Sequence, residues 1–138
     1  MVFVDSSALI AVLDRDEERH SRALAAWSEL MERDAVLLTT SYVLLETAAL
    51  VQKRIGLHAV RALHDDVTPV LTVDWIAEDS HMRGVEATLF AARRALSVVD
   101  CVSFRSMRQH QIDTAFTFDA HFREQGFTVI PEPTSSPG

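Results

Sequence analysis

The chain has 138 residues, of which 48% are hydrophobic, and its formal net charge is -7. This size suits one domain with one hydrophobic core, and the acidic balance argues against binding nucleic acid through a general surplus of Lys and Arg. The single cysteine, Cys101, excludes an internal disulfide, and the common zinc motifs are absent from the sequence. We expect a cytoplasmic protein with neither a secretory signal nor a membrane span.

Short apolar runs alternate with segments of helical spacing along the chain. We predict strands over 2–4, 36–39, 70–73, 114–118 and 128–130. Helices are predicted after Asp5, over about 20–33, 42–54 and 57–65, after Asp74, and over about 100–110 and 120–125. Strands separated by helices indicate a single three-layer α/β domain, with a mostly parallel central sheet and helices on both faces. We assign this domain to residues 1–131 and expect residues 132–138, rich in Pro and Ser, to form a disordered tail.

Two aspartates stand directly after apolar runs that we predict to be strands. Asp5 follows the first strand, and Asp119 follows the run that ends at Phe118. In an open parallel sheet, ligands bind beyond the carboxyl ends of the strands, so both aspartates are positioned for chemistry. Each of them also suits the N-cap of the following helix, and a capping carboxylate can still bind a metal ion.

Glu46 and Asp100 lie in apolar segments, where a charge is unexpected. On a helix, Glu46 shares a face with Val43 and Leu50. A buried carboxylate is costly unless it has a cationic partner, a hydrogen-bond network or a metal ion. An arginine partner for Glu46, and a helix start at Asp100, are the alternative explanations. Together with the two aspartates at strand ends, however, these acids predict a site for Mg²⁺ or Mn²⁺, which would remove the repulsion between clustered carboxylates.

Other polar residues have more ordinary interpretations. Asp74 follows a predicted strand, and we interpret it as the N-cap of the next helix. We interpret the acidic run in residues 14–18 as a solvated turn or helix end, and we find no ligand pair among the six histidines. Ser6 and Ser7 lack the Gly-x-Ser-x-Gly context of an activated serine. Their hydroxyls are therefore expected to support Asp5 or to contact a phosphate.

At this point the sequence resembles a PIN domain, and particularly the VapC type of toxin ribonuclease. The order and spacing of several segments carry the resemblance, which spans nearly the whole chain before the tail. These segments are Val-Phe-Val-Asp-Ser-Ser-Ala-Leu at 2–9, Thr-Thr-Ser-Tyr-Val-Leu-Leu-Glu-Thr at 39–47, Leu-Ser-Val-Val-Asp-Cys-Val-Ser-Phe at 96–104, Ala-Phe-Thr-Phe-Asp-Ala-His-Phe at 115–122 and Gly-Phe at 126–127.

The resemblance implies a parallel sheet covered on both faces and metal coordination by Asp5, Glu46, Asp100 and Asp119. It also implies Mg²⁺ or Mn²⁺ as cofactor, RNA as substrate, a homodimer and, in the VapC group, a cognate antitoxin that blocks the site. Thr117 matches a family position near the fourth acid, where a hydroxyl would orient water or a phosphate.

We therefore predict a ribonuclease in which the four acids hold one or two metal ions that activate a water for in-line attack on phosphorus. A non-catalytic PIN-like module that binds RNA or protein, and a PIN ribonuclease without an antitoxin, are the alternatives. Phosphoaspartyl chemistry is disfavoured because the first strand is not followed by Asp-x-Asp. Candidate phosphate contacts are the basic residues Lys53, Arg54, Arg93, Arg94, Arg105 and Arg108.

Overall fold

The computed structural model describes residues 1–134, so the predicted disordered tail at 132–138 lies mostly outside the described residues. Five strands are present: β1 Val2–Val4, β2 Leu37–Thr40, β3 Thr72–Asp74, β4 Thr114–Phe116 and β5 Thr128–Ile130. The α-helices are α1 Ser6–Leu13, α2 His20–Glu32, α3 Ser41–Arg54, α4 Leu57–Ala62, α5 Glu78–Ala91, α6 Val98–Gln109 and α7 His121–Glu124.

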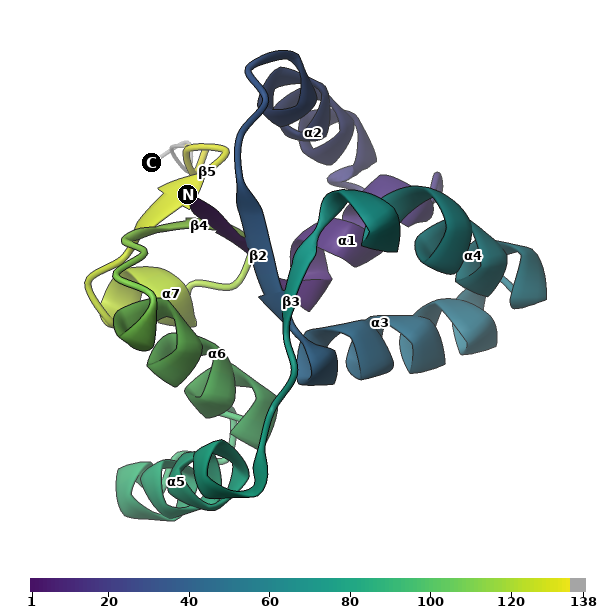
Figure 1. Cartoon of the computed structure of the whole chain (residues 1–138). Helices are drawn as coiled ribbons and strands as arrows, with labels where there is room; N and C mark the ends of the chain where they lie inside the picture. The colour runs from purple at the N-terminus through teal and green to yellow at the C-terminus, as the bar shows by residue number, and fades with distance from the viewer. Residues whose placement is uncertain (135–138) are drawn as a thin grey trace.

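The strands form one parallel sheet in the order β3-β2-β1-β4-β5. Figure 1 shows α1, α3 and α4 on one side of this sheet and α6 and α7 on the other. This confirms the predicted α/β domain with a parallel sheet and helices on both faces. The inner strands β1 and β2 are buried along their whole length because both of their faces are covered, whereas the edge strand β3 is partly exposed.

β1 is the central strand, and it is buried along its whole length. Phe3 lies within 6.2 Å of the Phe122 ring of α7, measured between ring centroids, and Phe104 of α6 lies 4.9 Å from the same ring. Aromatic contacts of this kind fix the relative positions of the elements that carry them. This packing therefore fixes the position of the beginning of α1, which follows β1, relative to α6 and α7.

The segment after α4 departs from the predicted helix over 57–65. The α-helix ends at Ala62, and a π-helical turn over Leu63–Val67 and a 3-10 turn over Thr68–Val70 follow it. Pro69 lies within the second turn, and proline cannot donate the backbone hydrogen bond that an α-helix needs. The next strand consequently begins at Thr72, two residues later than predicted.

The interpretation of Asp74 as a helix N-cap is wrong. Asp74 ends β3, where it pairs with Thr40, and its carboxylate accepts a hydrogen bond of 2.6 Å from the Ser106 hydroxyl of α6. The helix α5 begins only at Glu78, with Ala77 at its N-cap. Asp74 and Asp5 share the same local sequence pattern, an acid at the end of an apolar run. Only their tertiary contacts show that Asp5 caps a helix and Asp74 does not.

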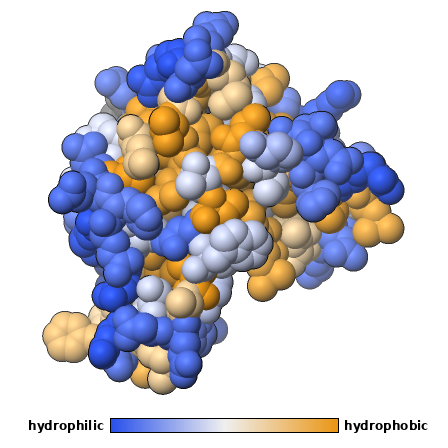
Figure 2. All heavy atoms as spheres, in the orientation of Figure 1, coloured by the Kyte–Doolittle hydropathy of each residue, from blue (hydrophilic) through white to orange (hydrophobic). Residues whose placement is uncertain are grey.

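Within residues 1–134, no helix combines the length and the apolar character that crossing a lipid bilayer requires. Several large apolar side chains are nonetheless exposed, notably Leu89 and Phe90 at the end of α5. Figure 2 shows apolar residues among hydrophilic ones at the end of the molecule where α5 lies in Figure 1.

Candidate active site

The candidate site lies where the chain changes direction within the sheet. From β1, the next strands in sequence, β2 and β3, lie on one side, whereas β4 and β5 lie on the other. Crevices at such switch points, beyond the carboxyl ends of the strands, are the usual ligand sites of open α/β sheets. All four predicted acids line one cleft of about 320 Å³ at this point, namely Asp5, Glu46, Asp100 and Asp119.

Asp5 is the most buried of these acids, with 3% of its surface exposed. It is the N-cap of α1, and its Oδ2 accepts hydrogen bonds from the hydroxyls of Ser7 at 2.7 Å and Thr117 at 2.8 Å. Among the described residues, Oδ1 accepts no hydrogen bond. Asp5 therefore caps α1 through Oδ2, as predicted, while its Oδ1 stays available to a metal ion.

Burial raises the pKa of the Asp5 carboxyl to about 6. The hydroxyls of Ser7 and Thr117 favour its charged form, while the charges of Asp100 and Asp119 disfavour it. The last contribution shows that the three carboxylates are close enough to repel one another. A cation placed among them would reverse this penalty.

Asp100 owes its position to the start of α6. Ser97 is the N-cap, its hydroxyl accepts a hydrogen bond from the Asp100 backbone N–H, and the Asp100 carboxylate accepts one from the Ser97 backbone N–H, both at 3.1 Å. This capping box fixes one carboxylate oxygen of Asp100 and leaves the other available. Burial, and then the negative charge of Asp119, raise the pKa of Asp100.

Asp119 lies between β4 and α7, and its Oδ1 accepts a hydrogen bond of 2.9 Å from the backbone N–H of His121. His121 Nδ1 also lies 2.9 Å from this oxygen, but this nitrogen is buried and has no hydrogen-bond partner in residues 1–134. One ligand atom each from Asp100, Asp119 and His121 lie within 4.8 Å of one another. His121 was not predicted, because histidine pairs were sought rather than a single histidine beside two acids.

Glu46 reaches the cleft from the second turn of α3, which begins after the N-cap Thr40. Its Oε1 accepts a hydrogen bond from the Ser6 hydroxyl. The alternative explanation, an arginine partner, finds no support, since none of the ion pairs in the described part of the chain includes Glu46. The side chain is half-buried, as its apolar neighbours in the sequence predicted.

The four acids share a pattern that suits a divalent cation. Each has one carboxylate oxygen held by a hydrogen bond from its own surroundings, and the second oxygen is not used in any hydrogen bond between described residues. Carboxylate oxygens are preferred ligands of Mg²⁺ and Mn²⁺. The His121 Nδ1 atom, which has no hydrogen-bond partner among the described residues, adds a nitrogen ligand of a kind that Mn²⁺ also binds. The residues present therefore fit a divalent metal ion.

The predicted basic residues are mostly elsewhere. Arg54 lines the cleft, but Arg93 forms an ion pair with Glu124 and Arg105 forms one with Asp79. Arg19, which was not predicted, lines the cleft instead and is paired with Glu17 at 2.9 Å. Glu17 itself also lines the cleft. The acidic run in residues 14–18 is therefore not wholly a solvated turn.

Comparisons with known proteins agree with this geometry. A PIN-domain family model matches residues 2–127. The chain is 31% identical over 131 residues to the "23S rRNA-specific endonuclease VapC20" of two Mycobacterium tuberculosis strains, covering 94% of this chain and 98% of the relative. The crystal structure of M. tuberculosis VapC20, described as a "Sarcin-Ricin loop cleaving toxin", superposes with a TM-score of 0.83 at 29% identity over 93% of this chain and 97% of that one.

A more distant structure, FitAcB from Neisseria gonorrhoeae, superposes with a TM-score of 0.66 at 14% identity, covering 94% of this chain and 96% of that chain. At this identity the likeness concerns the fold alone. The same arrangement of strands and helices is thus shared well beyond the range of evident sequence similarity.

Proposed function

The chain belongs to the PIN-domain family, and from this premise we propose that it is a divalent-metal-dependent ribonuclease of the VapC toxin type, hydrolysing RNA phosphodiester bonds. The observation that carries the proposal is the meeting of four acids from distant parts of the sequence in one cleft at the switch point of the sheet. Asp5, Glu46, Asp100 and Asp119 are the proposed metal ligands and catalytic residues, and the proposed metal is Mg²⁺ or Mn²⁺.

When bound, a divalent cation supplies Lewis-acid stabilisation of the phosphate and lowers the pKa of a coordinated water. The chain's own residues supply the geometry. Asp5 is held by two hydroxyls, and the Thr117 hydroxyl that donates to Asp5 also accepts a hydrogen bond of 3.0 Å from the Asp119 backbone N–H. Thr117 thereby fixes two of the acids relative to each other. The Ser6 hydroxyl donates a hydrogen bond to Glu46 alone, and we propose that Ser6 and Thr117 act as positioning residues through the carboxylates.

The substrate class follows from the relatives. VapC20 is described as specific for 23S rRNA and as cleaving the sarcin-ricin loop, and we propose that this chain also cuts a structured RNA of that kind. We also propose a cytoplasmic protein, a homodimer and a cognate antitoxin that blocks the cleft. The exposed side chains of Leu89 and Phe90 on α5 provide apolar surface for such an interface.

The test is a cleavage assay with purified protein freed of any partner. Total RNA and a synthetic sarcin-ricin stem-loop are incubated with Mg²⁺ or Mn²⁺, or with EDTA, and the cut ends are mapped. We expect specific cleavage that EDTA abolishes and that Asp5→Asn and Asp100→Asn reduce by more than about 100-fold. Asp66→Asn, which changes an exposed acid far along the chain from these residues, is the matched control and should retain activity.

If the folded wild-type protein, loaded with metal, leaves both RNAs intact, a non-catalytic PIN-like binding module is the better description. A separate assay addresses the partner: purification of the native complex from the source cells should yield a small protein that inhibits cleavage. Recovery of fully active protein without any such companion would indicate a PIN ribonuclease that lacks an antitoxin.

A further inference from the structure

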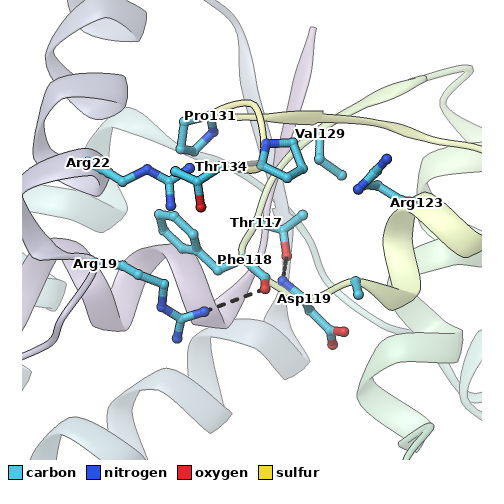
Figure 3. A pocket seen from close by; sticks show the side chains of 11 residues that line it. Arg19, Arg22, Thr117, Phe118, Asp119, Arg123, Val129, Pro131 and Thr134 are labelled. Atoms are coloured by element: carbon cyan, nitrogen blue, oxygen red, sulfur yellow. Dashed lines mark hydrogen bonds between the residues drawn. The ribbon is translucent and has the colours of Figure 1, made fainter. Parts of the chain in front are cut away.

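A second pocket, of about 190 Å³, adjoins the carboxylate cleft (Figure 3). It shares Arg19 and Asp119 with that cleft. Arg19 and Arg22 extend toward Phe118 from the beginning of α2, and Arg123 of α7 lies on the opposite side of the pocket. The segment after β4, which carries Asp119 into the cleft, thus separates two adjoining spaces of opposite electrostatic character.

The charge of this pocket is unusual for the molecule. The chain as a whole is acidic, yet three arginines and a single acid, Asp119, line this space. In residues 1–134, the ion pairs within 4 Å include neither Arg22 nor Arg123. No carboxylate of the described residues therefore neutralises their guanidinium charges, in contrast to those of Arg83 and Arg93.

Phe118 holds two of the guanidinium groups in place. The Cζ atoms of Arg19 and Arg22 lie 4.8 and 5.5 Å from the centre of its ring. Arg19 also donates a hydrogen bond of 3.5 Å to the Phe118 carbonyl, and Arg22 donates one of 2.7 Å to the Glu132 carbonyl. Arg19 is also held by its ion pair with Glu17, whereas Arg22 makes only the one hydrogen bond among the described residues. These contacts order both side chains while leaving further N–H donors free, most of all on Arg22. The arginines are thereby pre-organised for a ligand.

We propose that this pocket binds a backbone phosphate of the RNA next to the phosphate that is cleaved, with Arg22 and Arg123 as its principal contacts and Phe118 as a positioning residue. The inference rests on the proposed ribonuclease function. Guanidinium groups match the geometry of phosphate oxygens, and the space suits one sugar-phosphate unit better than a helix of a protein partner. The direct connection to the carboxylate cleft through Arg19 and Asp119 favours RNA over an acidic peptide.

Binding is measured in the Asp100→Asn background, so that the RNA is not cut, using the fluorescently labelled sarcin-ricin stem-loop as probe at several salt concentrations. We expect Arg22→Gln and Arg123→Gln each to weaken binding by about 5- to 10-fold and to reduce the slope of log K against log salt by about 0.7 to 0.9. Phe118→Leu should weaken binding by about 2- to 3-fold with an unchanged slope, because both charges remain. Arg61→Gln, at an exposed arginine of α4, is the matched control.

The outcomes separate this inference from the proposed function. If the wild type cleaves RNA but both arginine variants bind the probe with unchanged affinity and slope, the pocket proposal is overturned while the ribonuclease stands. If the wild type cuts no RNA but the variants show the expected loss of affinity and slope, the pocket binds an RNA phosphate and the proposed ribonuclease function is the part that fails. If the variants lose affinity only for a co-purifying protein, the occupant is an acidic peptide and the proposal is wrong.

Discussion

Replacing Asp5 with asparagine should stabilise the fold of the metal-free protein, although the same change should remove the RNA cleavage that the metal-loaded protein shows. Burial raises the pKa of Asp5 from its ordinary value of 3.8 to about 6, so the charged form is disfavoured in the folded state. At pH values above 6 this difference in pKa lowers the free energy of unfolding by about 3 kcal/mol. Asn removes the charge and keeps an oxygen that accepts hydrogen bonds from Ser7 and Thr117.

The sign of the pH dependence follows from proton binding. Between pH 3.8 and 6 the folded protein retains a proton on Asp5 that the unfolded chain has lost, so the stability of the wild type falls as the pH rises. Below pH 3.8 both states are protonated and the cost is absent. Above pH 6 both are ionised and the cost is constant. The gain from Asp5→Asn should therefore be small at pH 4.5 and largest at pH 8.

Urea denaturation in EDTA at pH 4.5 and pH 8 measures this effect. At pH 8 we expect Asp5→Asn to raise the free energy of unfolding by about 1 to 3 kcal/mol, which corresponds to an increase in Tm of about 3 to 9 °C for a chain of this size. Asp66→Asn, at an exposed position, should change it by less than about 0.5 kcal/mol. Equal or lower stability of Asp5→Asn at pH 8 would refute the assignment of a costly buried charge to Asp5.

Two further substitutions test the packing that supports the site. Thr117→Val should lower the free energy of unfolding by about 1 to 3 kcal/mol, because the Asp119 N–H and the Asp5 carboxylate lose a partner, whereas Thr117→Ser should retain most of the stability in urea denaturation. Gly84→Ala should cost about 1 to 3 kcal/mol, because the added Cβ would lie 2.4 Å from Cγ2 of Val102. The double variant with Val102→Ala should lose less than the two single changes together, and strict additivity would contradict this contact between α5 and α6.

The sequence predicted the fold and the place of the acids because both depend on local patterns and a general topological rule. Strand ends are visible as the last residue of an apolar run, and parallel strands bring their carboxyl ends to one edge of the sheet. Asp5 and Asp119 could be found in this way. Glu46 and Asp100 were found because a charge within an apolar segment needs an explanation. The same reasoning misassigned Asp74, since its hydrogen bond to Ser106 of α6 is a tertiary contact that no local pattern reveals.

The arginine pocket was missed for a physical reason that also shapes how the site works. Arg19 and Arg22 have the spacing of an ordinary solvated helix face, and Glu17 belongs to an acidic run typical of a turn. Only the return of the chain through Phe118 brings an aromatic ring against both guanidinium groups. Because Phe118 directly precedes Asp119, one short segment sets the positions of both a proposed metal ligand and one of the proposed phosphate contacts, Arg22. A displacement of this segment would therefore disturb metal binding and RNA binding together, which couples the two halves of the site through the backbone.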